Sequence, residues 1–224
     1  MCGRFGLSLG AEDLAELLEV DLEQLPVFGP RYNIAPSQDL LALRIVDDSP
    51  QPTLLRWGLL PFWAKDKRLA YKLINARSET AAQKPAFRAA FKHRRCLIAA
   101  DGFYEWKKVG KVKEPYHIGL KDQRPFCFAG LWESWVDQET GEVVESATIL
   151  TTGPNDLVAP LHERMPVIVR PDLMKGWLSG DDGRLDKVFS PYDPSLMECW
   201  PVSPRVNRPI HDDPQLRLRQ ERLL

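Results

Sequence analysis

The spacing of prolines and glycines limits the fold of this chain more than any other feature. Nineteen of its 224 residues are proline and fourteen are glycine. They separate short stretches rich in β-branched and aromatic residues, which favour strands. Because proline interrupts both helices and sheets, we expect short elements with irregular connections. The pattern predicts an α+β fold in one strand-dominated domain, 1–224, rather than alternating strand–helix units.

Hydrophobic periodicity places the individual elements. Helices are expected over 11–20, 85–92 and 172–178. Strands are expected over 40–46, 53–57, 96–100, 116–120, 126–131, 147–151, 165–169 and 198–202. The tail from about residue 201 is rich in proline and arginine, and we expect it to be loosely packed with a frayed end.

Cysteine and histidine usage argues against a metal centre. The four cysteines and four histidines are scattered, and no two cysteines form a CxxC pair. They are Cys2, Cys96, Cys127, Cys199, His93, His117, His162 and His211. This distribution predicts neither a zinc site nor a disulfide framework and suits a reducing compartment. With no signal-peptide core and no apolar run of membrane-spanning length, we expect a cytoplasmic protein without membrane, metal or cofactor.

Charge is unevenly distributed along a chain of net charge −1. Residues 11–23 carry only acidic charges, whereas residues 65–95 carry ten lysines and arginines against Asp66 and Glu79. Such a basic segment indicates a nucleic-acid or phosphate surface. A solvated helix face beside an acidic one explains the same pattern equally well.

The chain begins Met-Cys-Gly, so removal of Met1 would leave Cys2 as an amino-terminal 1,2-aminothiol. An aldehyde can form a Schiff base with the amine and then be trapped by the thiol as a five-membered ring, with the high effective molarity of an intramolecular reaction. The α-amino group has a reference pKa of about 7.7–8.0, against about 10.4 for lysine, so much more of it is neutral near pH 7. The alternative is that Cys2 is a small buried hydrophobe.

Two segments offer aromatic and basic groups for DNA. The run 57–63 places Trp57 and Trp63 just before the basic segment, where bases could stack on their rings, although Trp57 is more typical of a core residue. In the run 74–80, Asn75 can orient a nucleophile and Arg77 can clamp a phosphate. A turn cap at Asn75 and a surface pair between Arg77 and Glu79 are the alternatives.

Two further segments offer acid–base groups. Glu105 follows an apolar strand and lies between Tyr104 and Trp106, so desolvation would raise its pKa and suit it to proton donation. An exposed strand glutamate is the alternative. His162, after the Thr151-Thr152 pair, titrates near neutrality and could shuttle a proton, or serve only a structural role.

Six motifs together, MCGRF, RYNIAPSQ, LRWGLLPFWAK, NARSET, DGFYEW and LHERMP, resemble the SRAP (SOS-response-associated peptidase) family. They occur in order from residue 1 to about 170. The resemblance implies an irregular mixed β-barrel, like PUA-type nucleic-acid modules, with short flanking helices. It also implies a monomer that crosslinks to abasic sites in single-stranded DNA during the DNA damage response, with autoproteolytic loss of Met1 and lyase-type Schiff-base chemistry.

The same resemblance assigns roles to particular residues. Cys2 would form a thiazolidine, Asn75 would position its amine, Glu105 would act as acid and base, and His162 would assist sugar ring opening. The DNA-contacting residues would be Arg4, Pro36, Trp63, Arg77, Trp106 and Thr151, with Thr152 nearby. Because the lesion is recognised by its aldehyde and missing base, little sequence preference is expected.

Three other functions remain open from the residues alone. An amino-terminal-nucleophile amidohydrolase, such as a glutamine amidotransferase domain, can also begin Met-Cys-Gly and use the free amine as base. A general thiol peptidase would use Cys2, Glu105 and His162 on other proteins. In a purely binding module, Cys2 would be structural.

Overall fold

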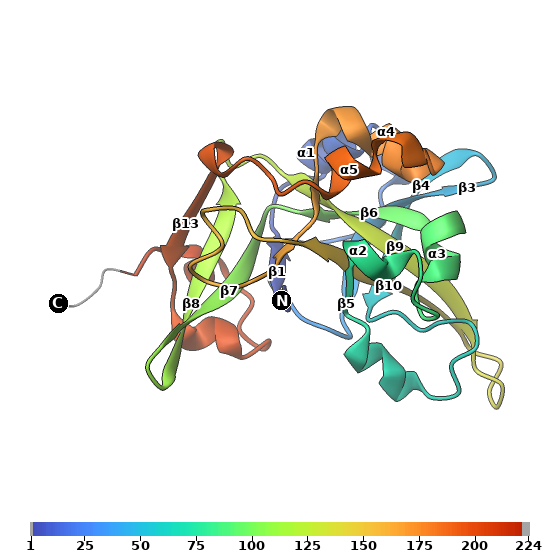
Figure 1. The fold of residues 1–224 in the computed structure, drawn as a ribbon, viewed down its shortest axis with the longest axis horizontal. Helices are drawn as coiled ribbons and strands as arrows, with labels where there is room; N and C mark the ends of the chain where they lie inside the picture. Colours follow the sequence, from blue (N-terminus) through green and yellow to red (C-terminus); the bar gives the residue numbers. More distant parts are fainter. Residues whose placement is uncertain (1, 221–224) are drawn as a thin grey trace.

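A closed five-stranded mixed barrel forms the larger part of the molecule (Figure 1). The structure, a computed structural model, describes residues 2–220. Neighbours around the barrel are β10, β4, β3, β6 and β9, and pairing of β9 with β10 closes the ring. The strands are β3 (Asp39–Val46), β4 (Ser49–Trp57), β6 (Arg95–Ala100), β9 (Phe126–Val136) and β10 (Val143–Thr152). Only the β10–β4 contact within this ring is parallel.

Three short strands extend this barrel at its open ends. β5 (Asn75–Arg77) runs parallel to β10, β11 (Met165–Pro166) pairs with β10, and β12 (Ile168–Val169) pairs with β9. The prediction of a single strand over 165–169 is therefore wrong in detail. The segment divides at Val167 because its two halves pair with different barrel strands.

A second, antiparallel sheet lies beside the barrel (Figure 1). Its strand order is β13-β8-β7-β1-β2. The strands are β1 (Phe5–Leu7), β2 (Arg31–Ile34), β7 (Gly102–Val109), β8 (Val112–Leu120) and β13 (Met197–Pro201). The chain passes from β6 to β7 through Asp101 alone, so one continuous stretch joins barrel and sheet.

The helices are short and lie outside the strands. They are α1 (Ala11–Leu18), α2 (Ser78–Ala81), α3 (Arg88–His93), α4 (Pro171–Ser179) and α5 (Leu185–Phe189). Single 3₁₀ turns occur at Leu22–Gln24, Lys67–Lys72, Asp182–Arg184, Pro194–Leu196, Pro204–Asn207 and Pro214–Arg217. Pro171 begins α4 at a position where its missing N–H costs nothing, and Gly180 ends it with a φ of 79°. No helix among the described residues is long and apolar enough to cross a membrane.

Aromatic side chains join β1 to the barrel core. Phe5 packs edge-on against Trp57 and Phe128, with ring centroids 5.2 and 5.7 Å apart. All three are essentially inaccessible to solvent, so Trp57 is a core residue, as one interpretation of the sequence had it. This packing fixes the start of the chain between the barrel and the second sheet. The expected α+β fold, an irregular mixed barrel with short helices, is confirmed.

The tail is packed rather than loose over residues 201–220. Val202, Val206 and Leu216 are buried and form a small cluster with Tyr104. The indole of Trp200 donates a 2.8 Å hydrogen bond to the carbonyl of Arg217. The loose packing expected from about residue 201 is therefore not found there, because apolar side chains at wide spacing anchor the segment to β7. The frayed end expected at the terminus falls on residues 221–224, outside the described residues.

Candidate active site

Cys2 lies at the junction of barrel and second sheet, just before β1. Its side chain is fully buried. Burial raises the pKa of the Cys2 thiol well above its ordinary value, and the negative charge of Glu105 raises it further. The sulfur is therefore a neutral thiol close to a carboxyl group. Burial in the main hydrophobic cluster fits the small-hydrophobe interpretation, but Glu105 and Asn75 also act on Cys2.

Asn75 holds the backbone of Cys2. Its Nδ2 donates a 2.7 Å hydrogen bond to the Cys2 carbonyl oxygen. Its Oδ1 is buried and accepts no hydrogen bond from any described residue. Since a buried polar atom without a partner is costly, this oxygen is an acceptor available to a group that arrives later. Asn75 is thus not a turn cap.

β5 determines where Asn75 and Arg77 point. The strand pairs in register with β10, Asn75 opposite Ile149 and Arg77 opposite Thr151. Alternation places Ala76 in the core, whereas Asn75 and Arg77 share the other face. Arg77 is exposed and forms no ion pair with any residue in 2–220.

Glu105 is a buried carboxyl on β7. Its side chain is 2% exposed, and burial raises its pKa to about 7. The neighbouring residue Phe103, on the same face of β7, is also buried, as strand alternation predicted. The exposed-glutamate alternative is wrong. A carboxyl that titrates near neutrality can both give and take a proton at physiological pH.

A surface pocket of about 410 Å³ opens onto Glu105. It is lined by Glu105, Trp106, Lys113, His162 and Asn207. The His162 Nδ1 accepts a 3.0 Å hydrogen bond from the backbone N–H of Arg164, which leaves Nε2 to carry the proton of a neutral ring. Burial is the main cause that lowers the pKa of His162; the backbone of Arg164 and the charge of Glu163 oppose the shift, and the charge of Lys113 adds slightly to it. The sequence did not single out Lys113 or Asn207.

An ion pair joins the NARSET and LHERMP motifs. Arg164 donates to both carboxylate oxygens of Glu79, at 2.6 and 2.8 Å, and to the carbonyl of Thr151 at 2.5 Å. Glu79 therefore pairs with Arg164, not with Arg77 as one interpretation had it. Thr151 is fully buried, and its hydroxyl donates a 3.3 Å hydrogen bond to the Ala76 carbonyl. This hydrogen bond holds β5 in place. Thr152 is also buried and bonds the Phe189 carbonyl.

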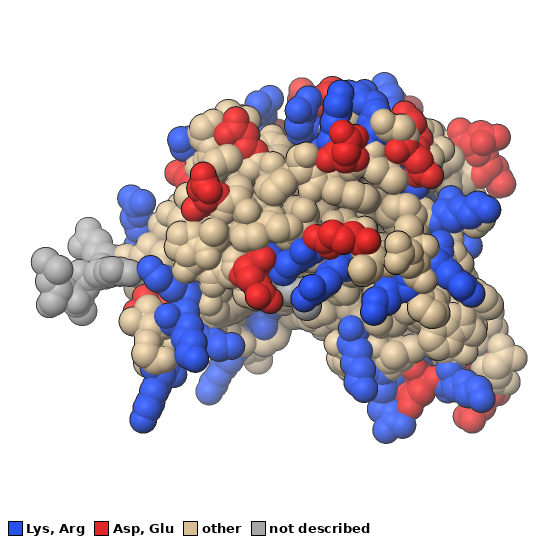
Figure 2. Space-filling model, viewed as in Figure 1, with Lys and Arg blue, Asp and Glu red and all other residues tan. Residues whose placement is uncertain are grey.

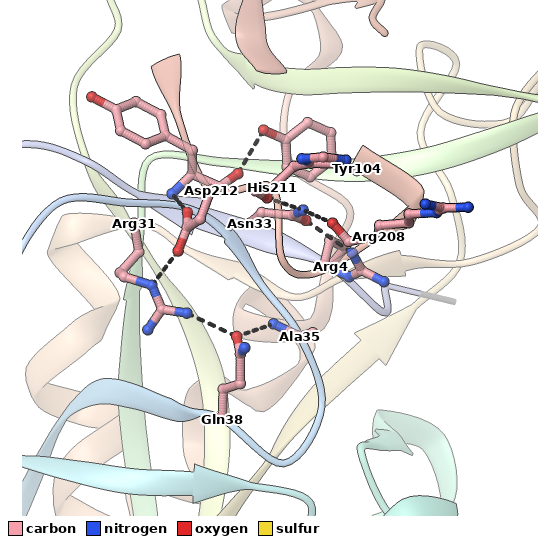
Figure 3. A network of polar contacts seen from close by, with 10 residues as sticks. Arg4, Arg31, Asn33, Ala35, Gln38, Tyr104, Arg208, His211 and Asp212 are labelled. Atoms are coloured by element: carbon pink, nitrogen blue, oxygen red, sulfur yellow. Dashed lines mark hydrogen bonds and ion pairs between the residues drawn. The ribbon is translucent and has the colours of Figure 1, made fainter. Parts of the chain in front are cut away.

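Arg4 is held by β2 and by the tail (Figure 3). Its Nη1 donates to the Oδ1 of Asn33 at 2.9 Å and to the Val206 carbonyl at 2.7 Å. Asn33, fully buried, donates in turn to the carbonyls of Val206, Arg208 and His211. The tail thus holds Arg4 both directly, at the Val206 carbonyl, and through Asn33, a role that the sequence did not indicate.

The aromatic and proline candidates divide into two groups. Trp106 lines the Glu105 pocket, and its indole donates a 2.7 Å hydrogen bond to Asn207 of the tail. Trp63 is 47% exposed and lines a different pocket, beside Phe62 and Trp135. Pro36 is half-buried in the loop between β2 and β3, away from the lining of the Glu105 pocket.

The basic segment is less uniform than its sequence suggests. Four of its ten cations form ion pairs: Lys67 with Asp137 and Glu142, Arg68 with Asp66, Arg94 with Glu133, and Arg95 with Asp182. Lysines and arginines nevertheless gather on the lower edge of the molecule in Figure 2, on both sides of a hollow. No group of three or more metal-binding side chains occurs in the part of the chain that the structure describes.

A family model decides the relationship. The model of the SOS response associated peptidase (SRAP) family matches residues 1–209. The chain belongs to the SRAP family. The resemblance carried by the six motifs is thereby confirmed.

Several proteins are similar to most of the chain. The abasic site processing protein YoqW of Bacillus subtilis is 44% identical over 224 residues, covering 96% of this chain and 98% of its own. The abasic site processing protein YedK of Escherichia coli is 35% identical, covering 80% and 79%. A crystal structure of a Bacteroides thetaiotaomicron protein superposes with a TM-score of 0.84 at 26% identity, over 98% of this chain and 100% of that one.

The fold brings residues of four motifs together. Cys2 and Arg4 precede β1, Asn75 lies on β5, Glu105 on β7 and His162 beside β11. Cys2 supplies a thiol, and the Asn75 amide donates a hydrogen bond to the Cys2 backbone. Glu105 supplies a carboxyl with a pKa of about 7, and His162 supplies a neutral imidazole. Such a set can protonate and deprotonate an adduct formed at Cys2.

Proposed function

We propose that this protein processes abasic sites by forming a covalent crosslink between Cys2 and the ring-opened sugar in single-stranded DNA. The observation that carries the proposal is Asn75, which donates a hydrogen bond to the Cys2 carbonyl and has a buried Oδ1 with no partner among the described residues. That oxygen can accept a hydrogen bond from the α-amine of Cys2 after Met1 is removed. The names of YoqW and YedK, abasic site processing proteins, support the same substrate.

The first step frees the amine. Water hydrolyses the peptide bond between Met1 and Cys2, releasing methionine and a new α-amino group. Glu105 is the general base for this self-cleavage, because its pKa of about 7 leaves much of it ionised at neutral pH. The peptidase activity implied by the family name is thereby used on the protein itself.

The second step builds the crosslink. The neutral amine adds to C1′ of the aldehyde, and the resulting carbinolamine loses water when Glu105 protonates its hydroxyl. The Cys2 thiol then adds to the imine carbon, while its proton returns through Glu105 to the imine nitrogen. One water is lost overall, and the product is a thiazolidine ring. Because the thiolate is the nucleophile, the carboxylate of Glu105 must take the thiol proton as the sulfur attacks.

The remaining groups bind and open the sugar. His162, neutral with its proton on Nε2, donates to the ring oxygen as the sugar opens. Arg4 and Arg77 neutralise phosphates on either side of the lesion, and Trp106 stacks on a neighbouring base. Little base-edge readout is needed, because the aldehyde itself is the recognised feature.

The test is a denaturing gel of protein mixed with a single-stranded oligonucleotide that carries one abasic site. A heat-stable shifted band is expected with the wild-type protein, and none is expected with Cys2→Ala or an undamaged strand. Mass spectrometry first establishes that Met1 is absent. Absence of the band from fully processed protein would contradict the proposal and favour the amidohydrolase.

A further inference from the structure

The hairpin formed by β7 and β8 carries a concentration of positive charge that the sequence did not single out. Lys107, Lys108, Lys111 and Lys113 lie within seven residues around a two-residue turn, Gly110–Lys111. Lys108, Lys111 and Lys113 are exposed, and within residues 2–220 none of the four forms an ion pair. Figure 2 shows this hairpin as one end of the basic lower edge.

The register of the hairpin places two of these charges directly opposite each other. Lys108 pairs with Lys113 across the strands, whereas Lys107 lies opposite Glu114. Cross-strand partners share one face of a sheet, and facing like charges destabilise an antiparallel pair. The chain therefore places two like charges at facing positions on the face that also carries Trp106. An anion bound between the two ammonium groups would relieve it.

The same face reaches the candidate active site. Lys113 lines the pocket that contains Glu105, Trp106 and His162, and its charge acts on His162. Lys108 lies two residues beyond Trp106 on the same face of β7, roughly 7 Å away at the rise of a strand. A strand of DNA leaving this pocket along the hairpin would place successive phosphates beside these lysines.

We propose that the Lys108–Lys113 face of the β7–β8 hairpin binds the phosphates on one side of the lesion. The inference rests on the proposed function, because it assumes that the abasic sugar binds in the pocket at Glu105. Ammonium groups act on phosphate as point charges without fixed geometry, which suits a flexible strand and carries no sequence information. The hairpin thus extends the binding surface beyond Arg4 and Arg77.

Binding is tested without chemistry by using a tetrahydrofuran analogue of the abasic site, which has no aldehyde. A fluorescent 15-nucleotide single strand carries it at the centre, and the Kd is measured between 50 and 200 mM NaCl. Lys108→Gln with Lys113→Gln should weaken binding about fivefold at 100 mM salt. The slope of log K against log salt should fall by about 1.4, since each phosphate contact on a single strand contributes about 0.7.

The matched control removes the same charge elsewhere. Lys121, at the far end of β8, and Lys187, on α5, are both exposed, so Lys121→Gln with Lys187→Gln should leave Kd and slope unchanged. Equal behaviour of the two double variants would overturn the proposal. Wild-type protein is also run against the aldehyde-bearing strand, where absence of a crosslink defeats the proposed function independently of the hairpin result.

Two further measurements separate DNA contact from a structural role. Two shorter DNA strands end two nucleotides from the analogue, one on its 5′ side and one on its 3′ side. The loss of affinity of the hairpin variant relative to wild type should vanish with one of these strands and persist with the other. Persistence on both would contradict a one-sided contact. Because neutralising Lys113 removes a like-charge contact, Lys113→Gln should keep or raise the Tm at low salt. A lowered Tm together with weakened DNA binding would mean that these lysines stabilise the folded hairpin rather than contact DNA.

Discussion

Asn75 Nδ2 lies 2.7 Å from the carbonyl oxygen of Cys2, and the two residues are 73 positions apart in the chain. The bond connects the barrel extension β5 to the segment that enters β1. It fixes the backbone of the nucleophile while leaving the other end of the amide, Oδ1, without a partner among residues 2–220. One side chain therefore both positions Cys2 and offers an acceptor to its amine.

Replacing Asn75 should impair chemistry more than binding. Asn75→Ala removes both the hydrogen bond to the Cys2 carbonyl and the Oδ1 acceptor. Misplacement of a reacting group by about 1 Å can slow a reaction about 100-fold. We expect crosslinking of the abasic strand to slow by about that factor, while the Kd for the tetrahydrofuran strand changes less than threefold. Single-turnover gels and fluorescence titration measure the two quantities. Equal losses in both would assign Asn75 to DNA binding.

The raised pKa of Glu105 should appear as a pH-dependent instability. Its pKa is about 7 in the folded protein against about 4.3 when unfolded, so the folded state binds more protons between these values. The favourable contribution is complete below about pH 4.3 and is lost as pH rises through 7. Glu105→Gln should therefore gain stability relative to wild type across this window, by up to about 3 kcal/mol above pH 7.

Urea unfolding of both proteins at intervals from pH 4.5 to 8 measures that difference. The crosslinking rate of Glu105→Gln should fall at least tenfold and lose its inflection near pH 7, because the amide cannot transfer a proton. A constant stability difference across the window would show that Glu105 is not protonated in the folded state at neutral pH.

The Glu79–Arg164 pair should contribute stability with the opposite pH sign. The hydrogen bonds from Arg164 lower the pKa of Glu79, so its stabilisation is present above the unfolded value of about 4.3 and is lost as pH falls through the folded pKa. Glu79 is half exposed, so solvent screening reduces the effect. Glu79→Gln should cost about 1 kcal/mol at pH 7 and little at pH 3.

Thermal melts at the two pH values test this, with Glu163→Gln as control, since Glu163 is an exposed neighbour of Arg164 in the same motif. A loss of the same size at both pH values would indicate that packing, rather than charge, holds the motifs together.

Local sequence patterns predicted the parts that depend on neighbouring residues. The barrel strands follow from their apolar composition, and alternation correctly placed Glu105 on the face of Phe103, although Tyr104 on the opposite face is buried as well. The short strands β1, β2 and β5 were not expected, because three or four residues carry too little periodicity to mark a strand. Their pairing depends on partners elsewhere in the chain.

Contacts between distant segments could not be read from composition. Glu79 in NARSET and Arg164 in LHERMP are 85 positions apart. The residues around Glu79 gave no reason to expect an ion pair with Arg164 rather than with Arg77. The tail was expected to be loose because its apolar anchors, such as Val206, are isolated among prolines and arginines. Only the fold shows that they meet Tyr104.

Asn33 should couple the tail to Arg4. Its amide makes hydrogen bonds to three tail carbonyls and to the Arg4 guanidinium, all in a fully buried position. Asn33→Ala leaves these groups without their partner, so we expect a loss of about 3 kcal/mol in stability and weaker binding of the tetrahydrofuran strand. The binding loss follows because Arg4 is no longer held toward the DNA.

Asn155 provides the matched control, since it is also buried and donates a 2.7 Å hydrogen bond to the Tyr192 carbonyl but none to Arg4. Asn155→Ala should lose comparable stability in urea and bind DNA normally. In a double-mutant cycle with Arg4→Ala, the binding losses from Asn33→Ala and Arg4→Ala should be less than additive, because both remove the same phosphate contact. Strict additivity would show that Asn33 supports the tail without positioning Arg4.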